Sequence, residues 1–245
     1  MRAAHIGCAG WSLARAAQPL FDAGASQLQR YATRFNATEI NSSFYRPHRR
    51  GTYERWAASV PPDFRFAVKL PRAISHEKRL AGCGDLLADF LAQAGGLGER
   101  LGSLLLQLPP SLAFHPVVAP AFLHELRRQH QGAVALEPRH ASWFTAEVDA
   151  LLRETQIARV LADPVLHAAG RDPGGWQQLV YLRLHGSPRV YYSDYSQEVL
   201  QALAQRIGLA LREGSGVWCI FDNTAAGAAT HNGLALAAAL NKDPP

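Results

Sequence analysis

Eight apolar runs, each closed or directly followed by a polar or charged residue, most constrain the fold of this 245-residue chain. Each run is four to six residues long, which is the usual length of a buried strand. The segments between the runs carry apolar residues at helical intervals. Such alternation of strands and helices is typical of α/β proteins with a parallel sheet. The runs are His5–Ala9, Ala37–Ile40, Phe64–Val68, Ser103–Leu106, Ala133–Leu136, Ile157–Ala162, Val180–Leu184 and Val217–Phe221.

Amphipathic helices are predicted between the runs. The first follows Ser26, which has the capping-box spacing to Gln29, and it carries Leu28 and Tyr31 on one face. The others are predicted over Gly51–Ser59, Asp85–Leu97, Phe122–His130, Ala146–Thr155, Gln197–Arg212 and Ala225–Leu240. Prolines and glycines leave no room for a helix between Asp163 and Gln178, so we expect an irregular loop there.

These patterns predict one α/β domain over residues 1–245, a single (β/α)₈ barrel of TIM type. The irregular loop replaces most of the helix after strand 6. The length agrees with the roughly 250 residues typical of such a barrel, and no linker divides the chain. A doubly wound sheet of flavodoxin type is the minor alternative, although it needs fewer strands.

The composition predicts a folded domain with a full core, and the charge favours an anionic ligand. The formal net charge is +5 and the isoelectric point is near 9.4. Basic residues form only doublets, such as Arg49-Arg50 and Arg127-Arg128, so nucleic-acid binding is permitted but not indicated. No apolar run approaches the roughly 20 residues of a membrane span, so no membrane association is expected.

The cysteines indicate a reducing compartment. Cys8, Cys83 and Cys219 show no spacing typical of zinc or of a disulfide framework, so we expect free core thiols in a cytoplasmic protein. Seven residues precede Cys8, too few for the charged and apolar regions of a signal peptide, and we expect none.

Polar residues at the strand ends are the candidate site, because TIM barrels place their chemistry at the carboxyl ends of the strands. Side chains alternate between the two faces of a strand, so residues two positions apart share a face. Three such pairs of polar residues occur at the strand ends. Charged pairs buried merely to neutralise one another are the alternative. We favour a site because barrel mouths are regularly used. The pairs are Glu39 with Asn41, Glu137 with Arg139, and Arg183 with His185.

Glu137 is the first candidate for a general acid or base, His185 the second and Glu39 the third. Burial would raise the pKa of Glu137 whereas Arg139 would lower it, and both outcomes stay open here. Imidazole titrates near neutral pH, which suits His185 to proton transfer. The residues expected to bind substrate are Trp11, Asn41, Lys69, His76, Gln107, Arg139, His140, Arg183 and Asn223.

Among these, the cations Lys69, Arg139 and Arg183 are expected to hold the anion, and Asn41, Gln107 and Asn223 to hydrogen-bond the ligand. No cofactor is implied and no metal ligand is assigned. A divalent metal would draw on Glu39, Glu137, Asp163, His185 and Asp222, whose spacing is not specific for metal.

Several strand-end segments together resemble the YecE-like family, a bacterial and archaeal family of unknown function. The segments run in order along essentially the whole chain. They include Gly10-Trp11-Ser12, Glu39-Ile40-Asn41-Ser42-Ser43-Phe44-Tyr45-Arg46, Phe66-Ala67-Val68-Lys69, Ile74-Ser75-His76, Leu106-Gln107-Leu108-Pro109-Pro110, Glu137-Pro138-Arg139-His140-Ala141-Ser142-Trp143, Arg183-Leu184-His185-Gly186 and Asp222-Asn223-Thr224. The resemblance implies a TIM-type barrel and marks the same site residues, but it implies no reaction.

The chain departs from the family pattern at three places: Pro138 replaces an aromatic residue, Cys8-Ala9 replaces Thr-Ser, and Asp222 replaces Asn. Pro138 removes a strand N–H donor between Glu137 and Arg139.

Three functions follow from these residues. The leading hypothesis is an enzyme that uses acid–base chemistry on a small anionic or polyhydroxylated substrate, which includes phosphorylated compounds. The first alternative is a metal-dependent nuclease or nucleic-acid-processing barrel, and the second is a non-catalytic module that binds a small ligand. The fold alone does not choose among them.

Overall fold

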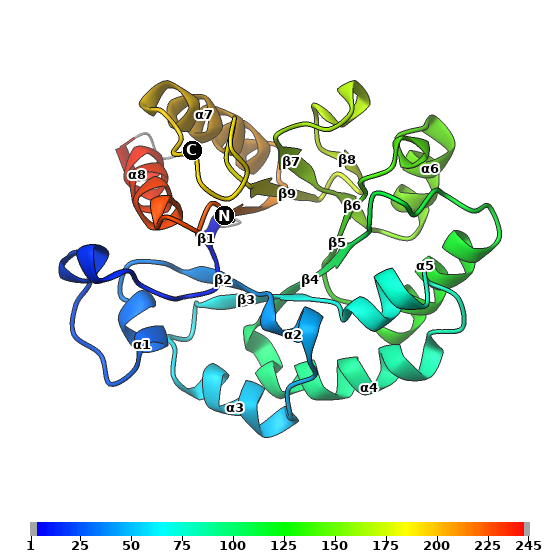
Figure 1. Cartoon of the computed structure of the whole chain (residues 1–245), viewed down its shortest axis with the longest axis horizontal. Coiled ribbons are helices and arrows are strands. Elements are labelled where there is room, and N and C mark those ends of the chain that lie inside the picture. The colour runs from blue at the N-terminus through cyan, green and yellow to red at the C-terminus, as the bar shows by residue number, and fades with distance from the viewer. Residues whose placement is uncertain (1–3, 243–245) are drawn as a thin grey trace.

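A computed structural model describes residues 4–242 of the chain. Its strands form a ring at the centre of the molecule, and its helices lie outside that ring (Figure 1). The strands are β1 Ala4–Ala9, β2 Ala37–Ile40, β3 Arg65–Lys69, β4 Leu101–Gln107, β5 Val134–Glu137, β6 Ala158–Arg159, β7 Leu161–Asp163, β8 Gly174–Gly175, β9 Leu179–Leu184 and β10 Gly216–Phe221.

The ring closes through a strand that is interrupted at one residue. The strand order is β7-β9-β10-β1-β2-β3-β4-β5-β6-β8, and every pairing is parallel except that of β8 with β6. β6 pairs with β5 and β7 pairs with β9, while only Val160 separates β6 from β7. The sixth apolar run therefore supplies β7 at one end of the sheet and, next to the terminal strand β8, β6 at the other. The predicted TIM-type α/β barrel is confirmed, and its ring is consistent with eight strand positions rather than an open doubly wound sheet.

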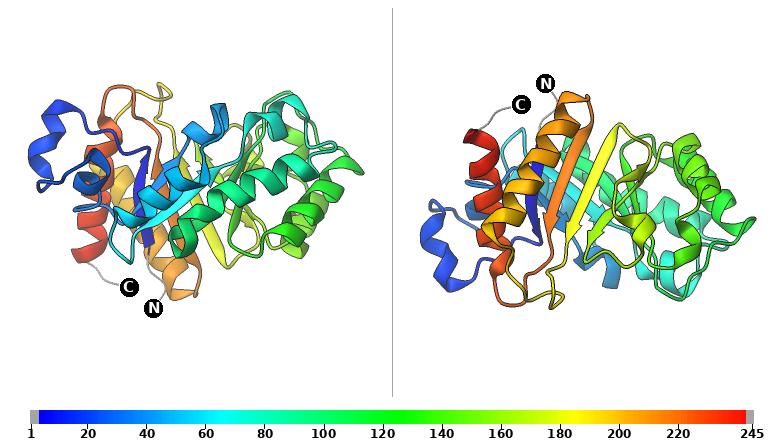
Figure 2. Two further views of the ribbon diagram at one scale, coloured as in Figure 1. Left: turned by 90° about the horizontal axis from the view of Figure 1, so that it is seen from below. Right: turned by 90° about the horizontal axis from the view of Figure 1, so that it is seen from above.

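The helices largely occupy the predicted segments. They are α1 Gln27–Tyr31, α2 Ser42–Tyr45, α3 Arg50–Ala58, α4 Gly84–Ala94, α5 Val118–Gln129, α6 Ala146–Glu154, α7 Gln197–Arg212 and α8 Ala228–Lys242. The predicted cap is present, because Ser26 Oγ accepts a hydrogen bond from Gln29 N at 3.2 Å. Figure 2 shows α7 and α8 side by side over β10 and β1.

The segment after β7 is irregular, as predicted. Between Asp163 and Leu179 the chain forms only a 3₁₀ turn at Ala168–Gly170 and the two-residue strand β8. Gly175 has a positive φ of 67° and donates its N–H to Asp149 Oδ1 at 2.9 Å. The side chain at the start of α6 thus anchors the loop that replaces a helix.

The barrel interior has a small apolar layer below its polar mouth. Alanines on β2, β3, β5 and β6 leave room for Tyr181 and Trp218, whose rings stack at a centroid distance of 5.9 Å. A larger core fills the space between the outer faces of the strands and the helices. All three cysteines are buried free thiols, which agrees with their expected role in the core.

No helix among residues 4–242 is long and apolar enough to cross a membrane.

A buried tyrosine hydroxyl joins β1 to β2. Tyr31 Oη accepts from Cys8 N at 2.7 Å and donates to Ala37 O at 2.9 Å. Gly7 lies against the same carbonyl, and a Cβ at that position would overlap the Ala37 oxygen. The hydroxyl therefore hydrogen-bonds one buried backbone group on each strand.

Replacing Tyr31 by Phe should lower the free energy of unfolding by about 1–3 kcal/mol, because it leaves a buried donor and acceptor unpaired. Urea denaturation monitored by circular dichroism measures the change. Tyr45→Phe is the matched control, because Tyr45 is 73% exposed. Equal stability of the two variants would contradict the role given to the Tyr31 hydroxyl.

Candidate active site

Polar side chains form the layer above the apolar interior at the carboxyl ends of the strands. Each lies two residues beyond an inward-facing apolar residue, so alternation brings it to the same side of the sheet. The buried members of this layer are Glu39, Lys69, Gln107, Glu137 and Arg183.

Arg183 is the centre of the layer. Its Nε and Nη2 donate to the two oxygens of Glu39 at 3.0 and 2.6 Å, and its Nη1 donates to Glu137 Oε2 at 2.7 Å. Nη2 also reaches Asp222 Oδ2 at 3.1 Å. Tyr181 Oη donates to Glu39 Oε2 at 2.8 Å. Glu39 is thus enclosed, and its observed role is to hold the guanidinium.

Glu137 is an ionised carboxylate. Its Oε1 accepts from Gln107 Nε2 at 3.0 Å and Arg139 Nη2 at 3.0 Å, and it lies 3.2 Å from His185 Nε2. Burial alone would raise the pKa of Glu137. The charge of Arg183, followed by His185 and Arg139, outweighs burial and holds this pKa well below its usual value. The question that the sequence left open is settled in favour of the cations.

His185 lies between two carboxylates. Nδ1 is 2.9 Å from Asp222 Oδ2 and Nε2 is 3.2 Å from Glu137 Oε1. Only the protonated ring can donate to both. Burial would lower the pKa of His185, but hydrogen bonding to Asp222 and Glu137 prevails and raises it. Burial would likewise raise the pKa of Asp222, yet Arg183 and then His185 keep it below its usual value.

Lys69 is the one basic side chain of the inner mouth whose ammonium contacts no carboxylate among residues 4–242. It ends β3, is 8% exposed, and places Nζ 4.2 Å from the centroid of the Phe44 ring. Burial, followed by the charge of Arg183, lowers the pKa of Lys69 to about 8. The nearby carboxylates, which Arg183 already binds, offset only part of this lowering of the pKa.

Further basic groups follow β3 and β5 at the same end of the barrel. The Arg139 side chain is 24% exposed, and His76 and His140 are half-buried. The pKa of His76 is lowered by burial and then by Lys69, Arg72 and Arg139, so its ring is neutral near pH 7. His140 Nδ1 accepts from Ser142 N at 3.2 Å and holds the loop after β5. The accessible part of the mouth therefore presents cations and hydrogen-bond donors above buried carboxylates.

Three predicted substrate-binding residues lie apart from the Arg183 cluster. Asn223 Nδ2 donates to Ser193 O at 2.9 Å and Asn232 Oδ1 at 2.8 Å, because its neighbour Asp222 takes the inward face. Asn41 begins α2, and its buried Oδ1 has no hydrogen-bond partner within the described chain. Trp11 packs edge-on against Trp56 at a ring-centroid distance of 5.1 Å.

Two neighbours of the site were not predicted from the sequence. Tyr181 binds Glu39, and its position two residues before Arg183 on β9 was a signal that alternation could have revealed. Phe44 lies beside Lys69 and also contacts the His76 ring edge-on at 4.9 Å. Because α2 follows β2 directly, strand periodicity carried no information on where Phe44 points.

The carboxylates considered for a metal are engaged by other groups. Arg183 lies among Glu39, Glu137 and Asp222, and Asp163 Oδ2 accepts from Tyr195 Oη at 2.6 Å. Within residues 4–242, no three His, Cys, Asp or Glu side chains are grouped so that they could hold a metal ion. A metal bound by these carboxylates would have to displace the guanidinium.

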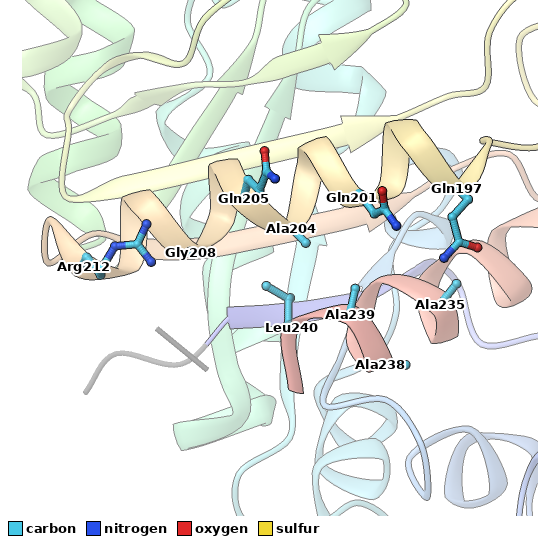
Figure 3. Close-up of a pocket in the computed structure, with 10 residues that line it drawn as sticks. All are labelled: Gln197, Gln201, Ala204, Gln205, Gly208, Arg212, Ala235, Ala238, Ala239 and Leu240. Atoms are coloured by element: carbon cyan, nitrogen blue, oxygen red, sulfur yellow. The ribbon is translucent and has the colours of Figure 1, made fainter. Parts of the chain in front are cut away.

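A separate groove of about 500 Å³ lies between α7 and α8. Figure 3 shows its lining of glutamine, alanine and leucine side chains, with Arg212 at one end. Among the described residues that line this groove, Arg212 alone is titratable, so they offer no acid–base pair comparable to that of the barrel mouth.

The family model described as "Protein of unknown function DUF72" matches residues 5–245. The UPF0759 protein YecE of Escherichia coli (strain K12) is 35% identical over 154 residues, or 60% of this chain and 56% of that protein. The chain thus spans little more than half the length of this relative. The UPF0759 protein YunF of Bacillus subtilis (strain 168) is 25% identical over 265 residues, covering 94% of this chain and 92% of its own.

Two solved structures share the fold. A DUF72 family protein from Enterococcus faecalis V583 superposes with a TM-score of 0.79 at 21% identity, over 98% of this chain and 96% of its own. Another from Thermotoga maritima MSB8 has a TM-score of 0.76 at 24% identity, over 97% and 99% of the two chains. At these identities the likeness concerns the fold alone.

Replacing Arg183 by Met should lower the free energy of unfolding by about 3–5 kcal/mol, because Glu39 and Glu137 would stay buried without their cation. Chemical denaturation measures the loss. Arg206→Met removes an exposed ion pair to Asp172 and should cost below about 1 kcal/mol. A similar cost for both variants would show that the buried network is not a main source of stability.

His185 should stabilise the fold mainly at low pH. Its folded-state pKa lies above the ordinary 6.5. Its contribution is therefore fully present below pH 6.5 and is lost as the pH rises through the folded pKa. The stability gap between the parent protein and His185→Gln, measured by urea denaturation over a pH series, should shrink across that interval. His231→Gln, at an exposed site, controls for loss of an imidazole. A gap that widens with pH would contradict this arrangement.

Proposed function

This chain belongs to the DUF72 family of proteins of unknown function, and we propose that it is an enzyme acting on a small anionic substrate at the mouth of its barrel. The substrate class includes phosphorylated and polyhydroxylated compounds. The reaction uses proton transfer. The support comes from the charges of the site, because neither the family nor the fold specifies a reaction.

The observation that carries the proposal is the unpaired ammonium of Lys69. A nearly buried cation without a counter-ion is costly, and it becomes favourable when an anion enters. The carboxylates around it already bind Arg183, at distances of 2.6 to 3.1 Å. The positive charge of Lys69 is thus left for an anionic ligand to neutralise.

Neighbouring side chains give the anion further partners. Arg139 is partly exposed and keeps donors beyond the Nε and Nη2 groups that face Glu137. Its planar fork suits a carboxylate or a phosphate. Gln107 offers its amide oxygen beside the same carboxylate, which suits a hydroxyl group of the substrate.

His185 is the group best placed to move a proton. Its ring is oriented by Asp222 on one nitrogen and Glu137 on the other, and imidazole titrates near neutral pH. Glu137 and Asp222 then stabilise the protonated ring, while Glu39 positions Arg183. Glu137 acts as an ionised carboxylate, because its lowered pKa disfavours a role as a general acid.

Lys69→Met should weaken the binding of inorganic phosphate or malonate at least about tenfold, since a hydrogen bond to a charged group contributes about 1.5–3 kcal/mol. Isothermal titration calorimetry measures the affinity. Lys78→Met is the matched control, because Lys78 is exposed. Equal binding by all three proteins, or none by any, would remove the anion site from the proposal.

Turnover separates an enzyme from a binding module. Compounds that bind with Lys69 dependence are incubated with the protein and followed by nuclear magnetic resonance, with His185→Gln as the comparison. Consumption by the parent protein alone supports the proposal. Tight binding without consumption would favour the non-catalytic module instead.

A further inference from the structure

We propose that Lys69 forms an imine with its substrate, which makes that substrate a carbonyl compound carrying a carboxylate or a phosphate. This inference rests on the proposed function, because it uses the same mouth and the same anion. It goes further by naming the reacting atom of the protein and the functional group of the ligand.

The use of lysine in this chain supports a chemical role. Of the 25 basic residues only three are lysines, Lys69, Lys78 and Lys242, and the other 22 are arginines. Arginine is the better residue for holding a carboxylate or phosphate through two hydrogen bonds. A guanidinium does not form imines, whereas a primary amine does. The one lysine at the mouth therefore stands where its nucleophilicity is an advantage.

The backbone at Lys69 is fixed while its amine is left unpaired. Ser43 Oγ donates to Lys69 O at 2.7 Å, and Leu70 N donates to Leu105 O at 2.9 Å. Among the described residues the ammonium has the face of Phe44 as its contact, at 4.2 Å, and no hydrogen-bond acceptor. A rigid strand end thus presents a free amine to the mouth.

The surroundings give this amine a larger neutral, nucleophilic fraction than an ordinary lysine has. Burial, followed by the charge of Arg183, lowers the pKa of Lys69 to about 8. A lysine that is desolvated and close to another cation is an activated nucleophile. No carboxylate of residues 4–242 forms an ion pair with this amine, so none of them must be displaced before it reacts.

The step conserves its atoms. The neutral Lys69 amine attacks the carbonyl carbon, both amine hydrogens leave with the carbonyl oxygen as water, and a carbon–nitrogen double bond remains. The protonated imine withdraws electrons from the carbon next to the imine carbon. A proton bound to that neighbouring carbon is then lost more easily. Arg139 faces the anionic group, and the neutral ring of His76 can accept the proton.

Reductive trapping tests the inference on the full chain. The protein is incubated with pyruvate or with dihydroxyacetone phosphate, and sodium borohydride is added to convert an imine into a stable secondary amine. Intact-mass and peptide mass spectrometry locate the adduct. The expected result is one adduct on Lys69 that requires both the carbonyl compound and borohydride and is suppressed by inorganic phosphate.

The scarcity of lysine makes the controls sharp. Besides the α-amino group, Lys78 and Lys242 are the only other primary amines. Lys69→Arg keeps the charge and should lose the adduct, whereas Lys78→Arg should retain it. Unchanged circular dichroism and thermal unfolding of Lys69→Arg establish that this loss is chemical and not due to misfolding.

The outcomes distinguish this inference from the function on which it rests. An adduct with pyruvate alone identifies a carboxylate ligand, and one with dihydroxyacetone phosphate alone identifies a phosphate ligand. No Lys69 adduct with either compound, or equal labelling of Lys78, overturns imine formation. If calorimetry still shows Lys69-dependent anion binding, the proposed function survives. If that binding is also absent, both fail.

Discussion

The guanidinium of Arg183 is the interaction on which the rest of the mouth depends. It connects β9 to the carboxylates of Glu39 on β2, Glu137 on β5 and Asp222 after β10. Buried charges are tolerated only when they are paired and hydrogen-bonded, so each of these side chains requires the others. Arginine suits the position because its planar fork serves several acceptors at fixed angles. The barrel is thereby cross-linked across its open end by one side chain.

This pairing explains why the other mouth residues are available. Since Arg183 and His185 bind the carboxylates, Lys69 forms no ion pair within residues 4–242 and Arg139 keeps free donors. The site thus holds its charges in place before any ligand arrives. Such preorganised dipoles and charges need little rearrangement when charge develops in a reaction.

The sequence predicted the barrel well because buried strands and amphipathic helices leave periodic patterns. Alternation also brought Glu137 and Arg183 to one face, and the structure joins them at 2.7 Å. Alternation did not predict the surroundings of Asn223, whose neighbour Asp222 faces inward. It does not apply to Asn41, because the backbone there has already turned into α2. Local patterns do not describe the turns after strands, so the surroundings of Lys69 emerged only from the tertiary structure.

The pairing of β1 with β10 has a consequence for biosynthesis. Five residue pairs, from Ala4 with Val217 to Cys8 with Phe221, join strands at opposite ends of the chain. During synthesis β1 leaves the ribosome long before its partner exists, and one edge of it stays open for most of translation. The hydroxyl of Tyr31 ties β1 to β2 early, but it does so on the edge opposite the one that awaits β10. Completion of the ring then waits for the last strand, since closing so long a loop is the slow and entropically costly event.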